Sequence, residues 1–552
     1  MVTNFLKNGR SIFLRKQTNI LSAAAAITIF YGTSMVLGIV RDRLLISRFY
    51  ACCREQLDVY WAAFRLPDTI FQLLVIGAFS AAFIPVFSEY LLKDKKTAYN
   101  IASSLINILV LIFLALSVFI FVFARPLSEL ITGAFSPQQI NLMVTMTRIM
   151  IFAQIFFLLS NFLTGIIQSH QRFLVPALSP VLYNLGIIFG ILALASPLGI
   201  YGPAIGVVVG AVLHFLVQLP LVFRLGVVYR FLFDFRHPGI KEMAKLMLPR
   251  TFSLAVAQIE TTVALFLATS LTAGSLTIFY LAQHLMQLPV RLVGTPIGQA
   301  ALPVLSQKRQ IELAEFKRIF IASFWQIFYF VLPATAILLV LRIPIVRLAF
   351  GAKGFPWQAT LVTGKAVAIF SLAIISQAVI QLLVRGFYAL HDTKTPLFIG
   401  VLSVVVNITL SIFLVFWFQL GILGLAVAIS VASFLQAILL FVFLDQQVGF
   451  EKRAFFCPFL KMGTAAIITT AFLWIPMRLL DRFILDTTRT INLVILTVAA
   501  TLVGLGVYFA LSWVFKIEEL KTVIRLIQRV GQWRQILKES EEILEPPIRS
   551  PV

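Results

Sequence analysis

The sequence predicts an all-α integral membrane protein: 14 transmembrane helices in two six-helix lobes related by a parallel repeat, plus two extra helices. Three observations predict this fold. First, 60% of the 552 residues are hydrophobic and only 12% are charged, whereas soluble domains average roughly 25% charged residues. Second, basic residues gather in short loops between long apolar runs. Third, two parts of the chain resemble each other at a spacing of about 220 residues.

The composition excludes several classes of function. A net charge of +22 would indicate nucleic-acid binding in a soluble protein. Here the basic residues lie between spans, where they set membrane orientation, so we expect no nucleic-acid partner. The sequence has no CxxC, HExxH, GxSxG or P-loop motif, which predicts neither an enzyme nor a bound cofactor or metal. Cys52, Cys53 and Cys457 have no metal-ligand spacing, and we expect them to be inert thiols.

The spans follow from the apolar runs, since a membrane-spanning helix needs roughly 20 such residues. Fourteen runs satisfy this requirement: 20–47, 57–90, 101–124, 139–168, 174–196, 200–224, 246–272, 276–306, 319–345, 358–389, 395–418, 421–446, 456–477 and 490–514.

Loop charges give the orientation and the domain organisation. Every second loop is basic, as are both ends of the chain, and the positive-inside rule then places both termini in the cytoplasm. Basic residues precede the first span, which we interpret as an uncleaved helix. The predicted organisation is a cytoplasmic segment 1–19, an N-terminal lobe 20–224, a cytoplasmic linker 225–245, a C-terminal lobe 246–446, two further spans in 447–515 and a cytoplasmic tail 516–552.

The tail has an amphipathic pattern. Apolar residues fall on one helical face, and basic residues lie elsewhere: Leu520, Val523, Ile524, Ile527 and Val530 against Lys521, Arg525 and Arg529. This pattern is typical of a helix lying on the cytoplasmic leaflet, and equally of a helix that binds a partner protein.

The repeat gives the geometry of the two lobes. The segment Ala-Phe-Ile-Pro-Val-Phe-Ser around Pro85 returns as Ala-Ala-Leu-Pro-Val-Leu-Ser around Pro303, and Pro176 and Gly199 have counterparts in Pro396 and Gly421. Six spans separate the copies, so both copies point the same way across the membrane. A parallel repeat of this kind predicts a central binding cavity between the lobes.

Charged residues inside the first two spans are the main candidates for function. Arg41 and Asp42 lie in span one, and Asp58 and Arg65 lie in span two. A charge at the bilayer centre costs about 2.5–3.5 kcal/mol, so such residues usually face a wet cavity. They could form an internal ion-pair set that locks two helices. Alternatively, they could form a cationic pocket for an anion, because the guanidinium fork fits phosphate.

The second lobe carries fewer charges. His284 and Arg291 are seven residues apart in span eight and share a helical face. Glu260 is the single acid of span seven, and with Asn407 it is a weak candidate for a Na⁺ or proton site.

Several segments together resemble the MurJ/MviN family, the lipid II flippases of the MOP exporter superfamily. They are Val-Leu-Gly-Ile-Val-Arg-Asp at 36–42, Asp58 with Arg65-Leu66-Pro67, the run 77–90, and Gly386-Phe387-Tyr388 followed by Asp392 and Lys394. The resemblance covers about residues 20–515. It implies fourteen helices, alternating access and an anionic polyprenyl-diphosphate glycolipid, lipid II, as cargo of a multi-pass protein in the bacterial plasma membrane. It further implies a role in peptidoglycan and cell-wall biogenesis and contact with cell-wall synthesis proteins.

The family's substrate-binding residues are matched here by Arg41, Asp58 and Arg65, whereas four of its charged positions are occupied by Met35, Phe71, Ile76 and His284. Arg291 shares a face with His284 and is a candidate to compensate. The departures keep two alternatives open. One is a flippase of the same fold for an O-antigen or teichoic precursor, and the other is a MATE-like cation-coupled exporter. The energy source is expected to be Na⁺ or H⁺ coupling or the membrane potential.

Overall fold

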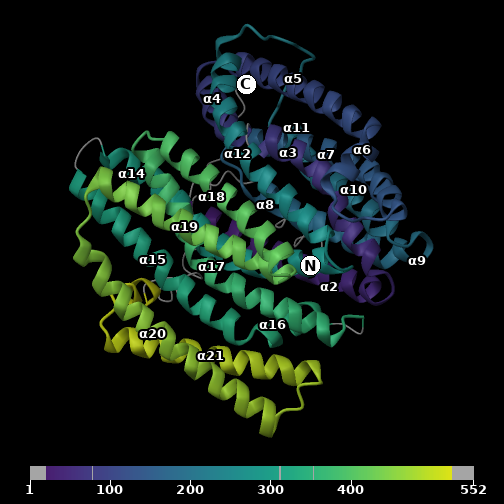
Figure 1. Ribbon diagram of the computed structural model, residues 1–552. Helices are drawn as coiled ribbons and strands as arrows, with labels where there is room; N and C mark the ends of the chain where they lie inside the picture. Colours follow the sequence, from purple (N-terminus) through teal and green to yellow (C-terminus); the bar gives the residue numbers. More distant parts are fainter. Residues whose placement is uncertain (1–19, 77–78, 310–312, 352–353, 525–552) are drawn as a thin grey trace, which may run out of the picture.

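A computed structural model describes residues 20–76, 79–309, 313–351 and 354–524. Every element within these ranges is helical. Figure 1 shows two groups of helices, with the N-terminal half in purple and blue and the C-terminal half in teal and green. The N-terminal half comprises α2 (Ile20–Ala63), α3 (Arg65–Phe71), α4 (Phe79–Lys93), α5 (Lys95–Val122), α6 (Ala124–Ile131), α7 (Pro137–Ser169), α8 (Leu174–Phe189), α9 (Ala195–Leu198), α10 (Tyr201–Leu216) and α11 (Leu219–Arg224).

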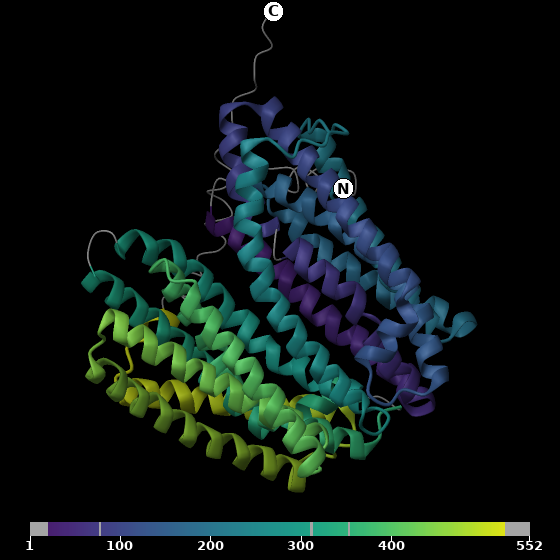
Figure 2. The ribbon, with the colours of Figure 1, turned by 45° about the horizontal axis from the view of Figure 1, so that its top comes forward.

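The C-terminal half begins with a long helix that contacts both groups. This helix, α12, packs against α4 of the first half and α18 of the second, and Figure 2 shows it in teal between the two groups. The second half comprises α12 (Pro238–Thr269), α13 (Ser275–Pro289), α14 (Thr295–Arg309), α15 (Leu313–Val340), α16 (Arg342–Phe350), α17 (Trp357–Ala389), α18 (Lys394–Ile412) and α19 (Ile422–Val448). Two further helices, α20 (Lys452–Leu479) and α21 (Thr490–Val514), pack against each other and onto α15.

The duplication seen in the sequence extends to irregular backbone. A π-helical turn at Gln72–Ile76 (η1) has its counterpart at Val290–Gly294 (η3), and one at Gly190–Leu194 (η2) has its counterpart at Phe413–Trp417 (η4). Gly199 adopts φ 57° and ψ −136°, and its counterpart Gly421 adopts φ 56° and ψ −133°. An L side chain rarely adopts this conformation, so glycine is required in both copies. The two halves therefore share a scaffold down to single turns.

Close helix contact explains a run of small residues in the first half. Gly202, Gly206 and Gly210 are four residues apart on α10 and face Gly186 on α8 and Gly190 at the start of η2. A Cβ atom at Gly206 would lie 2.9 Å from both the Gly186 carbonyl oxygen and the Gly190 Cα. Spacing of small residues by four lets membrane helices approach closely, where van der Waals contact stabilises them.

The number of spans is supported in part. Eleven helices of the described residues are long and apolar enough to cross a membrane. The three other expected spans, 20–47, 57–90 and 246–272, fall on α2, on the end of α2 with α3, η1 and α4, and on α12. The first two carry charged residues, the second also includes the undescribed residues 77–78, and the third has only a shorter apolar stretch at Leu254–Thr269. The total of fourteen stays a prediction. The π-helical turn η5 (Leu480–Ile484) lies just beyond the thirteenth expected span, 456–477.

Two local expectations are affected. Cys52 and Cys53 form a disulfide bond where the backbone of α2 leaves helical geometry at Cys53, so the expectation of free thiols was wrong for this pair. At the start of the tail, Ile517 and Val523 are buried in the main apolar core. The remainder of the predicted amphipathic helix, from 525 onward, lies outside the described residues.

Candidate functional site

Asp58 of the N-terminal half caps a helix of the C-terminal half. Its Oδ2 accepts a hydrogen bond from the Gly274 backbone N–H at 2.6 Å. Its Oδ1 accepts from the Thr277 backbone N–H at 2.8 Å and from the Thr277 hydroxyl at 2.6 Å. The carboxylate thus satisfies amide groups at the start of α13 that lack partners within the helix, and its charge is favourable at that end. Asp58 is buried, with 4% exposure, so these hydrogen bonds between the two halves are shielded from solvent.

Asp42 forms a second link between the halves. Its Oδ1 accepts from Nε and Nη2 of Arg41 at 2.9 and 2.7 Å, and its Oδ2 lies 3.0 Å from Nδ1 of His284 on α13. Arg41 also donates to the Asn184 side-chain oxygen on α8 at 3.2 Å. The Asp42 side chain is buried and the Arg41 side chain is 17% exposed, whereas His284 is 41% exposed. His284 is therefore the solvent-exposed member of this hydrogen-bonded set.

Arg65 provides a third link. It begins α3, directly after the helix break at Phe64, and its guanidinium reaches α12. Nε donates to the Thr262 hydroxyl at 3.0 Å, and Nη2 donates to both the backbone and side-chain oxygens of Gln258 at 2.6 Å. All three acceptors are neutral, so Arg65 keeps its full charge in a mostly buried position.

The predicted residues are brought together only in part. Arg41, Asp42 and His284 form one connected set. The hydrogen bonds of the Asp58 carboxylate go to α13 and not to an arginine. Arg291 lies beyond the start of η3 and is exposed, and no described residue forms an ion pair with it. The structure therefore gives no direct contact between Arg291 and the Arg41–Asp42–His284 set.

Other contacts between the halves gather around the same part of α2 and the start of α13. Arg43 donates to the backbone carbonyl of Leu348 on α16. The rings of Tyr50 and Phe355 meet edge to face with centroids 4.8 Å apart. The Gly133 amide donates to the Thr269 hydroxyl at 2.9 Å. The halves are therefore joined at this end by polar and aromatic contacts.

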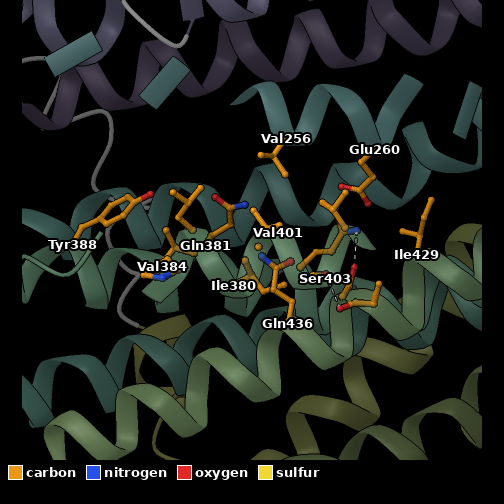
Figure 3. A pocket seen from close by; sticks show the side chains of 18 residues that line it. Val256, Glu260, Ile380, Gln381, Val384, Tyr388, Val401, Ser403, Ile429 and Gln436 are labelled. Atoms are coloured by element: carbon orange, nitrogen blue, oxygen red, sulfur yellow. Dashed lines mark hydrogen bonds between the residues drawn. The ribbon is translucent and has the colours of Figure 1, made fainter. Parts of the chain in front are cut away.

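A polar pocket of about 330 Å³ lies within the C-terminal half (Figure 3). Figure 3 shows Glu260 of α12 and Tyr388 of α17 at opposite ends of the pocket, with Gln381 of α17, Ser403 of α18 and Gln436 of α19 between them. The Glu260 carboxylate accepts from the Asn407 amide at 2.5 Å, and Asn407 in turn accepts from Ser411 at 3.3 Å. Glutamines, serines and one acid line this pocket, and no basic side chain does. It suits a proton or a cation better than an anion.

Several partners in these contacts were missed by reasoning from the sequence. They are uncharged: Asn184, Gln258, Thr262, Gly274 and Thr277. Polar side chains inside apolar spans are a usable signal for Asn184 and Gln258. Gly274 and Thr277 bind Asp58 mainly through backbone amides, which leave no trace in residue type.

Comparison with known proteins gives a consistent assignment. The family described as lipid II flippase MurJ matches residues 54–498. The chain is 28% identical over 524 residues to the lipid II flippase MurJ of Burkholderia cenocepacia, covering 90% of this chain and 97% of the relative. It is 30% identical over 458 residues to the probable lipid II flippase MurJ of Vibrio cholerae, covering 80% and 86%.

Solved structures agree on the fold. A structure titled lipid II flippase MurJ, inward closed conformation, has a TM-score of 0.72 at 24% identity and covers 88% of this chain and 98% of its own. An inward-facing multidrug resistance MATE family transporter of the MOP superfamily has a TM-score of 0.63 at 15% identity, with coverage of 75% and 94%. At these identities the likeness shows a shared architecture.

Proposed function

Because this chain belongs to the lipid II flippase MurJ family, we propose that it moves lipid II, an anionic polyprenyl-diphosphate glycolipid, from the inner to the outer leaflet of the bacterial plasma membrane. The observation that carries this proposal is the family match over residues 54–498. The protein acts as a transporter with both termini in the cytoplasm, where the basic loops place them.

The contacts between the halves support alternating access. Asp58, Asp42 and Arg65 each bond from the N-terminal half to α12 or α13. These bonds stabilise one arrangement of the halves, and their loss would allow the opposite one. A discrete set of contacts that differ between two arrangements is what a switching transporter requires.

We place the cargo's diphosphate near Arg41, Arg65 and His284. Arg65 is the strongest candidate because its present partners are neutral, so a phosphate would gain a charge-assisted bidentate contact. Arg41 is already paired with Asp42 and would bind an anion more weakly unless that pair rearranges.

The driving force follows from the charge of the cargo. Moving one negative charge outward across an inside-negative membrane releases about 2.3 kcal/mol per 100 mV. Glu260 with Asn407 is our proposed site for coupling to H⁺ or Na⁺. Its single carboxylate suffices to hold a proton. Exposure of the lipid II headgroup in the rescue assay described below, measured with and without Na⁺ for the wild type and for Glu260→Gln, separates an ion-coupled mechanism from one driven by potential alone.

The test is rescue of a strain depleted of its own lipid II flippase, with exposure of the lipid II headgroup at the outer surface as the direct readout. We expect the wild type to restore exposure and Arg65→Ala to lose it. Arg148→Ala is a matched control, because Arg148 lies on α7 and donates to the Phe121 carbonyl away from α12 and α13. Normal expression without headgroup exposure by the wild type would refute lipid II as cargo.

A second cargo is favoured by one specific observation. Met35, Phe71, Ile76 and His284 occupy positions where the family carries charges, so fewer fixed charges surround the diphosphate. Rescue of a strain lacking an O-antigen or teichoic-precursor flippase, together with failure to rescue the lipid II strain, would support that cargo.

A further inference from the structure

A second cavity lies in the N-terminal half, in the part nearer to the basic loops. It has a volume of about 460 Å³ and is lined by α5, α7, α10, α11 and the linker that follows α11. In Figure 1 these helices lie in the upper right part of the molecule, away from α15, α17 and α19. The cavity is therefore separate from the Arg41–Asp42–His284 set.

The interior of this cavity is apolar because residues of the linker form hydrogen bonds with the polar side chains that line it. Asn107 donates to the Leu232 carbonyl at 2.9 Å and accepts from the Tyr229 hydroxyl at 2.5 Å, and the Ser103 hydroxyl accepts from the Arg230 amide at 3.1 Å. These bonds fasten the linker to α5. What remains for an occupant is a surface of Leu, Ile, Val and Phe side chains. Such a surface offers contact for a hydrocarbon chain and no partner for a polar headgroup.

The cavity reaches from buried to exposed residues. Ala102, Phe162 and Ile166 line it with 2%, 1% and 2% exposure, whereas Leu111 and Phe223 line it with 57% and 74% exposure. Its lining on α5 runs from Tyr99 to Leu114, which are separated by fifteen rises of about 1.5 Å each, or about 22 Å. One leaflet with its headgroups is about 20–22 Å thick. A chain entering from the bilayer would therefore fit along a single leaflet.

Exposed arginines lie next to lining residues in the sequence. Arg224, Arg230 and Arg236 are exposed on α11 and the linker, and none of them forms an ion pair within the described ranges. Asp234, the one acid between the end of α11 and the start of α12, accepts hydrogen bonds from the backbone amides of Arg236 and His237 at 3.0 Å. Exposed aromatic side chains alternate with these arginines: Tyr229, Phe231, Phe233 and Phe235. Aromatic and basic residues in this combination are typical of a segment at the membrane interface.

We infer that this cavity is a binding site for an anionic phospholipid of the inner leaflet, with one acyl chain between α5, α7 and α10–α11 and its phosphate among Arg224, Arg230 and Arg236. The cargo's own tail is a poorer occupant. Its headgroup would lie between the two halves, on α2, α3 and α13, while this cavity is bounded by other helices of the N-terminal half. A bound lipid would hold the linker at the membrane surface while the two halves move.

The experiment uses the full chain in nanodiscs that contain phosphatidylglycerol with a diazirine on its acyl chain. After illumination, the labelled peptides are mapped by mass spectrometry. We expect labelling on α5 and on α10–α11 at lining residues. Val110→Trp places a larger side chain in the cavity and should lower the labelling of these residues at least fivefold. Leu116→Trp is the matched control, since Leu116 is an exposed residue of the same helix outside the lining.

A second pair of variants tests the headgroup without altering the cavity. Arg224→Gln with Arg230→Gln should remove the preference for phosphatidylglycerol over phosphatidylcholine, whereas Arg478→Gln with Arg482→Gln should retain it. The inference is overturned if Val110→Trp and Leu116→Trp label alike, if the neutral lipid labels as strongly as the anionic one in the wild type, or if polyprenyl phosphate displaces phosphatidylglycerol at equal concentration. Labelling requires no transport, so failure here and failure of the proposed function are distinguishable.

Discussion

Replacing Asp58 by Asn should loosen the contact between the two halves at the start of α13. The amide keeps one oxygen, which can still accept from the Thr277 amide and hydroxyl, but its NH₂ group then faces the Gly274 N–H. One charge-assisted hydrogen bond is lost and two are weakened to neutral bonds. Hydrogen bonds to charged groups contribute about 1.5–3 kcal/mol and neutral ones about 1 kcal/mol. The expected cost is about 3 kcal/mol, or roughly a hundredfold increase in the population in which this contact is open.

Hydrogen–deuterium exchange measures this population directly, because the Gly274 and Thr277 amides are the groups that Asp58 protects. The peptide covering residues 272–280 should exchange up to a hundredfold faster at these two amides in Asp58→Asn. Asp94→Asn is the matched control: it makes the same change at a carboxylate that caps α5 through the Lys96 and Thr97 amides, and exchange at 272–280 should stay as in the wild type. An increase below threefold in Asp58→Asn, or an equal increase in the control, would refute the reasoning.

Three further predictions follow from other contacts. Gly206→Ala should lower the melting temperature of the purified protein, because the new Cβ meets backbone of α8 at 2.9 Å, while Gly463→Ala, with open space around it, should not; equal melting temperatures would contradict the close α8–α10 contact. Arg65→Lys should reduce rescue of the depletion strain at least tenfold, since an ammonium lacks the fork that spans the Gln258 and Thr262 acceptors; full rescue would show that charge alone suffices. Burial raises the pKa of Asp392 in the loop before α18, but hydrogen bonds from Thr395, Gln447 and Lys394 outweigh it and lower this pKa below its usual value. The stabilisation is therefore present above about pH 4 and lost as the pH falls through the lowered pKa, so the melting temperatures of the wild type and Asp392→Asn should differ at pH 6, and the difference should shrink as the pH is lowered below 4.

The fold was predictable because its determinants are periodic and local. Apolar runs of span length, basic loops between them and the repeat around Pro85 and Pro303 are visible without any contact between distant residues. The paired π-helical turns were not predictable, since neither Gln72–Ile76 nor Val290–Gly294 carries a distinctive residue pattern. These turns depend on how the helices pack, which is a property of the whole half.

The site was predictable in its charged members and not in their partners. Arg41, Asp42, Asp58 and Arg65 stand out because charge inside a span is costly. Asp58 precedes Arg65 by seven residues, and helical periodicity would place both on one face. The approach of α13 decides the contact of Asp58 instead, because the carboxylate accepts from the backbone amides of Gly274 and Thr277. Backbone donors are identical for every residue type, so their position emerges only from the arrangement of helices.

The partners of Arg65 give a physical route by which cargo could change the arrangement of the halves. Its guanidinium joins α3 to α12 through neutral oxygens of Gln258 and Thr262. A phosphate offers the same donors a charged and bidentate acceptor, and charge-assisted bonds are roughly twice as strong as neutral ones. A diphosphate that binds Arg65 therefore competes with the bonds that hold α3 to α12. A ligand shifts an equilibrium by its difference in affinity for the two states. Binding at Arg65 weakens one of the contacts that closes this arrangement, while Asp58 at the start of α13 is left in place. Opening then requires both displacement of the Arg65 bonds by the headgroup and breakage of the Asp58 contact. This requirement ties movement of the halves to the presence of an anionic headgroup.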